Sequence, residues 1–278
     1  MELEGYLARI GFEGGIKPDL ECLTKIHRCH ALNVPYENLD VQLERPVDQD
    51  VARIYEKIVN GRRGGWCYEQ NGLLGWALRE AGFDVKRVTG AMMRHQYGDR
   101  TIGNHVLLLV KLDQTYIADL GVGDGNREPL PLVECEHRQG ELTFRLEKID
   151  DGYWRFHNHA MAYPTKFDFS EDPADEQLIE RKSQALQIDP ESIFVQNLVC
   201  QIMRENTIIC LTGKVMRQKT QDGTEKTMIS SADELARTLV DVFGIEDSDA
   251  KSLWPKVQAR HAELFGDQVL DDIEISGM

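Results

Sequence analysis

The chain has 278 residues, of which 41% are hydrophobic and 28% charged, a balance typical of a globular protein and not of a disordered or fibrous one. Its 47 acidic and 32 basic residues give a formal net charge of -15, which repels phosphates and anionic lipid headgroups, so we expect no nucleic acid and no membrane partner. The N-terminus lacks a signal-peptide pattern and no aliphatic run is long enough to cross a bilayer, which predicts a soluble, cytoplasmic protein.

The first region, residues 1–82, is predicted to be a helical bundle. Its apolar residues recur three and four positions apart, which places them on one face of each helix. Gly61 and Gly82 follow two of these segments and are the expected helix ends. The predicted helices cover residues 3–10, 20–27, 51–60 and 67–81.

The second region, residues 83–187, switches to short strand-like runs separated by turn residues, which predicts an antiparallel sheet or barrel. A charge-rich stretch near its end, Glu171–Lys182, is interpreted as a solvent-facing helix surface. The expected strands are Phe83–Met93, His105–Leu112, Tyr116–Leu120, Leu142–Ile149 and Tyr153–His159.

The third region, residues 188–278, is predicted to be α/β. Strands are expected at Asn206–Gln218 and Lys226–Ser230, and helices follow them. The first of these helices is expected to open with a capping box formed by Ser231 and Glu234. The whole chain is therefore predicted to belong to the α+β class.

Cys67 is the strongest candidate for a catalytic residue. It follows two glycines and opens an apolar-patterned helix, where unpaired N–H groups and the helix dipole favour a thiolate and lower the thiol pKa. The other five cysteines form no CxxC pair, and we expect them to be free thiols that pack as small apolar side chains.

A cysteine nucleophile needs a base, and the base needs an orienting acceptor. His105 opens one predicted strand and Asp119 closes the next, so an antiparallel pairing makes them neighbours. We expect His105 within hydrogen-bond distance of both Cys67 and Asp119. Transglutaminases and papain-like thiol hydrolases present the same order of cysteine, histidine and acid, so these classes remain open.

Five segments resemble the arylamine N-acetyltransferase family, in the same order and across nearly the whole chain. They are VPYENLD (34–40), RGGWCYEQN (63–71), NHVLLLV (104–110), YIADLGVGDG (116–125) and DPESIFVQN (189–197). The resemblance implies a helical bundle, an antiparallel β-barrel and an α/β lid that share a Cys-His-Asp triad.

The same resemblance implies a reaction and its partners. Acetyl-CoA is the expected donor, and the acceptor is an arylamine, an arylhydrazine or an N-hydroxyarylamine, acetylated by ping-pong transfer through the cysteine. No metal is expected. A macrolactam-forming amide synthase of the same fold remains an alternative, and the sequence leaves a homodimer open as a further partner.

Substrate contacts are also implied by the family. Tyr36, Met92 and Val122 are the expected acceptor-binding residues, and two of them depart from the family, which commonly has phenylalanine at the positions of Tyr36 and Val122. The family also implies that Arg63 ties down Glu37 and braces the approach to the nucleophile.

The resemblance also implies that the loop at residues 121–125 borders the site and lies close to the CoA pyrophosphate. It lacks the spacing of a dinucleotide fingerprint and no helix follows it. We expect Gly123, Gly125 and Arg127 to contact CoA, since Asp124 would oppose an anion.

Two histidine pairs, His27/His30 and His157/His159, invite a metal interpretation, but two ligands do not make a site.

Overall fold

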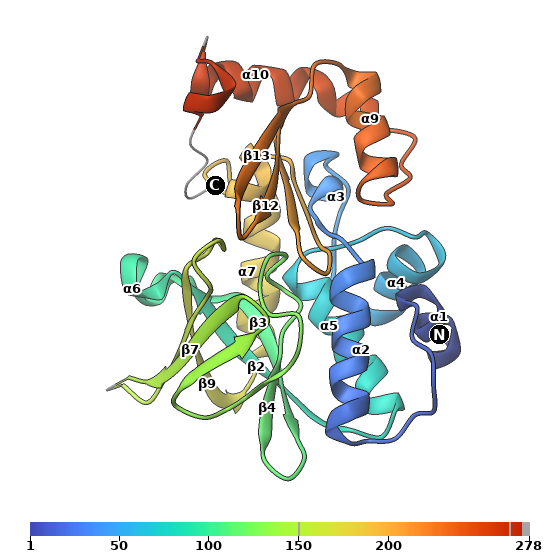
Figure 1. Ribbon diagram of the computed structural model, residues 1–278, viewed down its shortest axis with the longest axis vertical. Coiled ribbons are helices and arrows are strands. Elements are labelled where there is room, and N and C mark those ends of the chain that lie inside the picture. Colours follow the sequence, from blue (N-terminus) through green and yellow to red (C-terminus); the bar gives the residue numbers. More distant parts are fainter. Residues whose placement is uncertain (150, 267, 274–278) are drawn as a thin grey trace.

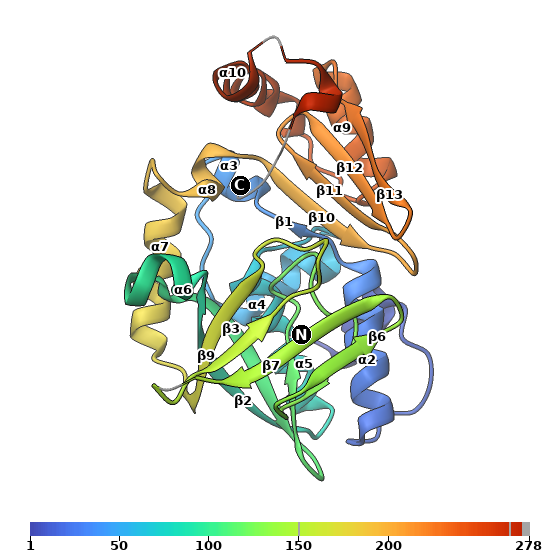
Figure 2. The ribbon, with the colours of Figure 1, turned by 60° about the vertical axis from the view of Figure 1, so that its left-hand side comes forward.

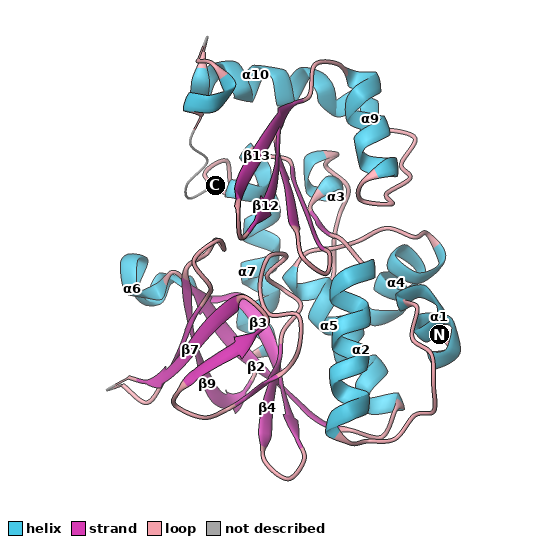
Figure 3. Cartoon of the chain, viewed as in Figure 1, coloured by secondary structure: helices cyan, strands magenta, loops and turns pink. Residues whose placement is uncertain are grey.

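The computed structural model describes residues 1–149, 151–266 and 268–273. Helices gather on one side of the molecule, an antiparallel barrel lies beside them, and a second sheet with its helices lies at the far end (Figures 1 and 3). No helix within the described residues is long and apolar enough to span a membrane. The predicted architecture of a helical region, a barrel and an α/β region is confirmed.

Four helical segments of the first region appear where the hydrophobic spacing predicts them. Helix α5 lies against the other helices and buries Leu73, Leu74, Ala77 and Leu78 in their common core. The third predicted helix begins as an α-helix and ends in a π-helical turn before Gly61. The elements are α1 Leu3–Ile10, α2 Leu20–Asn33, β1 Tyr36–Glu37, α3 Leu39–Gln42, α4 Val51–Tyr55, the turn Glu56–Asn60 and α5 Cys67–Glu80.

The barrel is an eight-stranded antiparallel sheet in the order β5-β4-β3-β2-β9-β8-β7-β6. Its interior combines aliphatic and aromatic side chains, and the rings of Phe156 and Phe167 stack with their centroids 4.6 Å apart. Strand β9 is absent from the sequence prediction because charged residues and a proline interrupt its apolar alternation. The strands are β2 Asp84–Met92, β3 Ile102–Lys111, β4 Thr115–Ala118, β5 Leu130–Pro131, β6 Glu136–Gln139, β7 Leu142–Lys148, β8 Trp154–His157 and β9 Lys166–Pro173, with α6 Arg94–Tyr97 and a 3-10 turn Gly98–Thr101 between β2 and β3.

Helix α7 (Glu176–Ile188) packs along β3 and leads to α8 (Ile193–Gln196), which lies beside α3 (Figure 2). The third region then folds into a sheet of order β1-β10-β11-β12-β13, whose first strand comes from residues 36–37. Its other elements are β10 Val199–Met203, β11 Ile208–Thr212, β12 Val215–Thr220, β13 Gly223–Met228, α9 Ala232–Asp241, α10 Trp254–Phe265 and 3-10 turns at Ala250–Leu253 and Leu270–Asp272.

Two sequence predictions for the third region need correction. The segment Asn206–Gln218 is a hairpin and not one strand, because Gly213 takes a left-handed conformation at φ 56° and reverses the chain. The cap of α9 is shared by two serines: Ser231 Oγ accepts from Glu234 N at 3.2 Å, whereas the Glu234 carboxylate accepts from Ser230 N at 2.8 Å.

The sheet that contains β1 joins the first and third regions. The predicted boundaries at 82/83 and 187/188 therefore separate stretches of different secondary structure, and we retain 1–82, 83–187 and 188–278 as a proposal for folding units. Residues 150, 267 and 274–278 of these ranges lie outside the described residues.

Candidate active site

Cys67 is the first residue of α5 and is 3% exposed. The chain reaches it through Gly64 and Gly65, where side chains have no room: a Cβ on Gly64 would lie 2.0 Å from the Pro35 carbonyl oxygen. Glu69 Oε2 accepts a hydrogen bond from the backbone N–H of Trp66 at 3.2 Å and so caps the helix. The double glycine is thus required by close packing.

His105 and Asp119 make the contact that the strand pattern predicts. His105 Nε2 lies 2.8 Å from Asp119 Oδ2, and both side chains are buried. On β2, Gly90 lies opposite His105, and a Cβ there would come within 2.8 Å of the imidazole ring. The absence of a side chain at Gly90 therefore makes space for the ring.

Asp119 is held on its other carboxylate oxygen as well. Asp119 Oδ1 accepts from Asn71 Nδ2 and from Gly121 N, each at 2.8 Å. Burial by itself would raise the pKa of Asp119, but the charge of His105 and these hydrogen bonds outweigh it and hold the pKa below its usual value. Asp119 is therefore a carboxylate in the folded protein.

Asn71 received no role in the sequence analysis. It lies one helical turn after Cys67, and its Oδ1 accepts from the N–H of Leu120 at 2.9 Å. Its spacing of four residues from Cys67 could have predicted a place in the site, because residues i and i+4 share a helix face.

The expected hydrogen bond between Cys67 and His105 is not formed. The Cys67 sulfur lies 4.0 Å from the Asn104 carbonyl oxygen instead, and His105 Nδ1 is buried without a hydrogen-bond partner among the described residues. Cys67 and His105 nevertheless both lie against Gly121. A Cβ built on Gly121 would lie 2.6 Å from Cys67 Cβ and 2.7 Å from His105 Cε1. The open Nδ1 is the imidazole atom not used by Asp119.

The pKa of the Cys67 thiol is raised, whereas its position at the start of a helix predicts a lowered pKa. Burial, followed by the negative charge of Asp119, raises the pKa of Cys67 above its ordinary value. The hydrogen bond to the Tyr68 backbone opposes this effect but is smaller. An isolated thiolate is therefore disfavoured, and ionisation needs a proton acceptor inside the site.

Two buried histidines of α2 contact the segments that carry Asp119 and Cys67. His27 Nε2 accepts from the backbone N–H of Asp119 at 3.1 Å while its Nδ1 donates to the Arg127 carbonyl oxygen at 2.9 Å. His30 Nε2 lies 2.7 Å from Gln70 Oε1. Nowhere in residues 1–149, 151–266 and 268–273 do three His, Cys, Asp or Glu side chains gather so as to hold a metal ion.

A cavity of about 500 Å³ opens beside Cys67 and His105. Tyr36, Met92 and Val122, the expected acceptor contacts, all line it. The third region supplies part of the wall, through Phe194, Val199 and Gln201, none of which the sequence analysis singled out.

Of the three expected CoA contacts, one lines the cavity and two do not. Gly123 lines the cavity, whereas Gly125 and Arg127 do not. Arg127 is only 4% exposed and its Nη1 lies 3.3 Å from a carboxylate oxygen of Glu141, so burial removes it from the cavity. Asp124 is buried too, and Lys219 of β12 pairs with it at 3.2 Å.

Two other cations line the cavity. Lys182 of α7 donates to the Arg100 carbonyl oxygen at 2.7 Å, and the Arg100 guanidinium lies 5.2 Å from the Tyr97 ring centroid. Neither forms an ion pair with a carboxylate of the described chain. Lys182 was expected on a solvent-facing helix surface, because a polar sequence pattern does not reveal which element lies opposite it.

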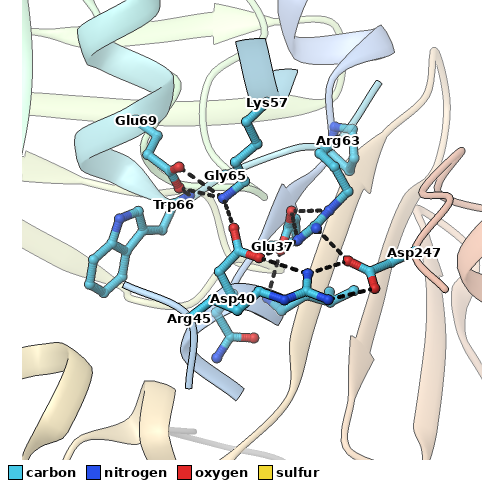
Figure 4. Close-up of polar contacts among 12 residues, drawn as sticks. Glu37, Asp40, Arg45, Lys57, Arg63, Gly65, Trp66, Glu69 and Asp247 are labelled. Atoms are coloured by element: carbon cyan, nitrogen blue, oxygen red, sulfur yellow. Dashed lines mark hydrogen bonds and ion pairs between the residues drawn. The ribbon is translucent and has the colours of Figure 1, made fainter. Parts of the chain in front are cut away.

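The predicted ion pair between Arg63 and Glu37 is present and buried. Arg63 Nη2 and Nε lie 2.8 and 3.0 Å from the same oxygen, Glu37 Oε1, and the other oxygen accepts from the N–H of Leu39 at 2.6 Å. Arg63 also reaches Asp247 of the third region, from Nη1 to Oδ2 at 2.6 Å (Figure 4). The pair therefore belongs to a larger cluster of charges.

Comparison with known proteins places these features in a family context. A family model described as N-acetyltransferase matches residues 19–251. The arylamine N-acetyltransferase of Mycolicibacterium smegmatis is 31% identical over 277 residues, covering 95% of this chain and 98% of that protein. The pineal gland isozyme NAT-3 of Gallus gallus is also 31% identical, covering 88% of this chain and 94% of that protein.

Solved structures agree with these sequence matches. The arylamine N-acetyltransferase from M. tuberculosis superposes with a TM-score of 0.84 at 27% identity, covering 92% of this chain and 99% of that one. The Mycobacterium marinum enzyme, in a structure in complex with CoA, has the same TM-score and identity and covers 95% and 99% of the two chains.

Proposed function

The chain belongs to the arylamine N-acetyltransferase family, and on this premise we propose that it transfers the acetyl group of acetyl-CoA to an arylamine, an arylhydrazine or an N-hydroxyarylamine through an acetyl-Cys67 intermediate. The observation that carries the proposal is the arrangement of the triad. Cys67 and His105 line the cavity, while Asp119 holds the imidazole from the protein side at 2.8 Å. The CoA complex of the M. marinum relative supports CoA as the donor's carrier.

The first half-reaction loads the enzyme. His105 Nδ1 accepts the proton of the Cys67 thiol, and the sulfur attacks the thioester carbonyl carbon. The bond between that carbon and the CoA sulfur breaks, and the imidazolium returns the proton to the departing CoA sulfur. Because burial disfavours a lone thiolate, the thiolate forms as an ion pair with the imidazolium that Asp119 stabilises.

The second half-reaction passes the acetyl group to the acceptor. The amine nitrogen attacks the acetyl carbon, His105 takes the proton that the nitrogen loses, and the Cys67 sulfur leaves and recovers that proton. The backbone N–H of Cys67, at the start of α5, is the proposed donor to the oxyanion in both halves. Ping-pong kinetics follow from this sequence of steps.

The walls of the cavity suit a flat apolar acceptor. Tyr36, Met92 and Val122 provide aromatic and thioether surface near Cys67, and we propose that they hold the aryl group. We propose the third region as a lid over this group, because Phe194 and Gln201 close the cavity from its side.

The CoA phosphates are proposed to lie against Arg100 and Lys182, with Gly123 bordering the chain of the donor. Two cations in the cavity wall counter the repulsion that a strongly acidic protein exerts on a polyanion. Asp189 and Glu191 also line the cavity, so the phosphates are placed on the side of Arg100 and Lys182. Replacing Arg100 and Lys182 by Met is expected to raise the KM for acetyl-CoA about tenfold each, whereas the exposed Arg53→Met is the matched control that leaves it unchanged.

One experiment tests the central proposal. Incubation with acetyl-CoA and no acceptor should add one acetyl group to the intact protein, and peptide mapping should place it on Cys67. Cys67→Ser should give no stable thioester, while Cys135→Ser, which changes an exposed cysteine, should be acetylated like the wild type. His105→Ala should slow acetylation at least about 100-fold. Acetylation of any other cysteine with Cys67 unmodified would overturn the assignment, and hydrolysis of amide substrates without CoA would indicate a thiol hydrolase.

An acceptor assay separates the remaining alternative of the same fold. Acetylated enzyme mixed with a simple aniline should release the acetanilide and regenerate the free thiol. If acetyl-Cys67 forms but no arylamine, arylhydrazine or N-hydroxyarylamine discharges it, a macrolactam-forming amide synthase becomes the better description.

A further inference from the structure

Lys57 connects Glu69 to Asp40 within a largely buried cluster of charged side chains (Figure 4). It lies in the π-helical turn Glu56–Asn60, and its ammonium contacts both oxygens of Glu69, at 2.8 and 3.0 Å, and Asp40 Oδ2 at 2.7 Å. The side chains of Lys57, Glu69 and Asp40 are 16%, 4% and 13% exposed. These short contacts, largely removed from water, make Lys57 the counter-ion of Glu69.

Glu69 is placed where its charge matters for chemistry. It is the third residue of α5, two after Cys67, and its carboxylate folds back to the N–H of Trp66 just before the helix. A carboxylate at this position competes with a thiolate for the positive potential of the helix N-terminus. Uncompensated, it would disfavour the ionised form of the neighbouring thiol.

We propose that Lys57 is a positioning residue for acetyl transfer: by neutralising Glu69 and holding it at the start of α5, it lets Cys67 ionise at the helix N-terminus. This inference rests on the proposed role of Cys67 as nucleophile. It assigns the cation a chemical role, in addition to the ion pairs that it makes.

Asp119 and Arg87, the other charged side chains that act on Cys67, have partners of their own. Asp119 is engaged by His105 and Asn71. Arg87 of β2 is paired with Glu176 at 2.7 Å. Each element packed against Cys67 contributes a charged or titratable group that acts on it. These groups are Glu69 and Tyr68 of α5, His105 of β3, Asp119 after β4, Arg87 of β2 and Tyr36 of β1. Among the carboxylates of this set, Glu69 is the one that Lys57 neutralises.

The cluster also keeps Lys57 charged. Burial disfavours its ammonium form, but the carboxylates around it outweigh burial and raise the pKa of Lys57. Asp40, its second partner, is shared with Arg63 at 3.3 Å and with Arg45 at 3.3 Å. Loss of Lys57 therefore leaves Asp40 with two cations, whereas Glu69 loses its only ion-pair partner within the described residues.

The test measures the ionisation of Cys67 without turnover. Wild type, Lys57→Met, Lys57→Arg, Glu69→Gln and the double variant Lys57→Met/Glu69→Gln are alkylated with iodoacetamide across pH, and the rate at Cys67 is followed by peptide mapping. Lys57→Met should raise the pH midpoint of Cys67 alkylation by about one unit. Lys57→Arg keeps the charge and should keep the midpoint, and the double variant should return it to the wild-type value.

Two controls separate this effect from general loss of structure. The exposed Cys135 in the same sample is the internal reference, and its midpoint should be the same in all variants. Arg155→Met breaks another ion pair, with the fully buried Asp168 of the barrel, and should leave the Cys67 midpoint unchanged. Thermal melting of each variant reports folding independently.

Specific outcomes would overturn the proposal. They are an unchanged Cys67 midpoint in Lys57→Met, a double variant shifted as far as Lys57→Met, or a Lys57→Arg variant shifted as far as Lys57→Met. If Lys57→Met does not fold, the Glu69→Gln variant provides the test. Its pH midpoint of Cys67 alkylation should be lower than that of the wild type or unchanged. A higher midpoint would contradict the proposal. Failure of Cys67 to take an acetyl group is a different result, which refutes the proposed function and not the electrostatic coupling.

Discussion

The side-chain amide of Asn71 joins helix α5 to the Asp119 carboxylate: Asn71 Nδ2 donates to Asp119 Oδ1 at 2.8 Å and to the Val106 carbonyl oxygen at 2.7 Å. Its Oδ1 accepts from the N–H of Leu120 at 2.9 Å. One fully buried side chain thus connects α5, β3 and the loop after β4. The position of Cys67, on the same helix, is therefore coupled to that of Asp119.

Asn71→Ala should therefore destabilise the protein and loosen the triad. It removes one donor from Asp119 and leaves the N–H of Leu120 unpaired, which is expected to lower the free energy of unfolding by about 1–3 kcal/mol. Urea denaturation measures this change, with Asn60→Ala as the matched control on an exposed asparagine. Equal stability of the two variants would show that the buried amide contributes nothing beyond a surface one.

Arg63→Ala should lower stability more than any single surface change. Arg63 pairs with Glu37 and Asp247, whose side chains are 0% and 5% exposed. Its removal strands the buried Glu37 carboxylate at a cost of roughly 3–5 kcal/mol, whereas Asp247 keeps its contact with Arg45 at 2.6 Å. Calorimetric melting and soluble yield check this expectation. An unchanged Tm with a selectively raised KM for acetyl-CoA would instead make Arg63 a donor contact.

Val122→Phe should change acceptor preference. Val122 lines the cavity beside the nucleophile, and a phenylalanine ring there would stack on a flat arylamine with about 0.5–1.5 kcal/mol of added stabilisation. We expect the variant to have a higher kcat/KM for a small aniline and a lower one for a bulky arylhydrazine. The wild type is the control, and unchanged values for both acceptors would show that residue 122 has no bearing on selectivity.

Acid should destabilise the protein in the range where its buried histidines resist protonation. Burial lowers the pKa of His30 from 6.5 to about 3, so between these values the unfolded chain binds a proton that the folded protein excludes. Stability is therefore full above about pH 6.5 and falls as the pH decreases toward 3, by up to about 1.4 kcal/mol per pH unit for this group. His27, whose pKa burial also lowers, acts in the same direction.

Urea denaturation at pH 7 and pH 5 measures this loss. His30→Gln should show a smaller decrease between the two pH values than the wild type, because glutamine does not titrate. An equal decrease in the two proteins would remove His30 from the acid response.

Much of the catalytic arrangement was predictable from local sequence. Two glycines before an apolar-patterned helix placed Cys67 at a helix start, and a short turn between two strands made His105 and Asp119 neighbours. These features depend on backbone periodicity and turn chemistry within about 15 residues, which are properties of the sequence itself.

The expected CoA contacts show what a local sequence pattern does not predict. Arg127 was expected at the cavity because of its place beside the glycine loop, yet it is buried against Glu141. Lys182 was expected on a solvent-facing surface, yet α7 packs on β3 and brings it to the cavity. The direction in which each side chain points depends on which elements pack together.

Periodicity and short motifs, which are local properties of the chain, were enough to predict the three-region architecture, the resemblance to the family and the three candidate triad residues. Tertiary structure alone decided that β1 pairs with β10 and that Asp247 reaches Arg63 across 184 positions of the chain. It also decided the pKa of Cys67: the helix N-terminus favours the thiolate, but burial against Asp119 dominates and raises the pKa. Burial and long-range charge depend on the packed fold, and no local pattern contains them.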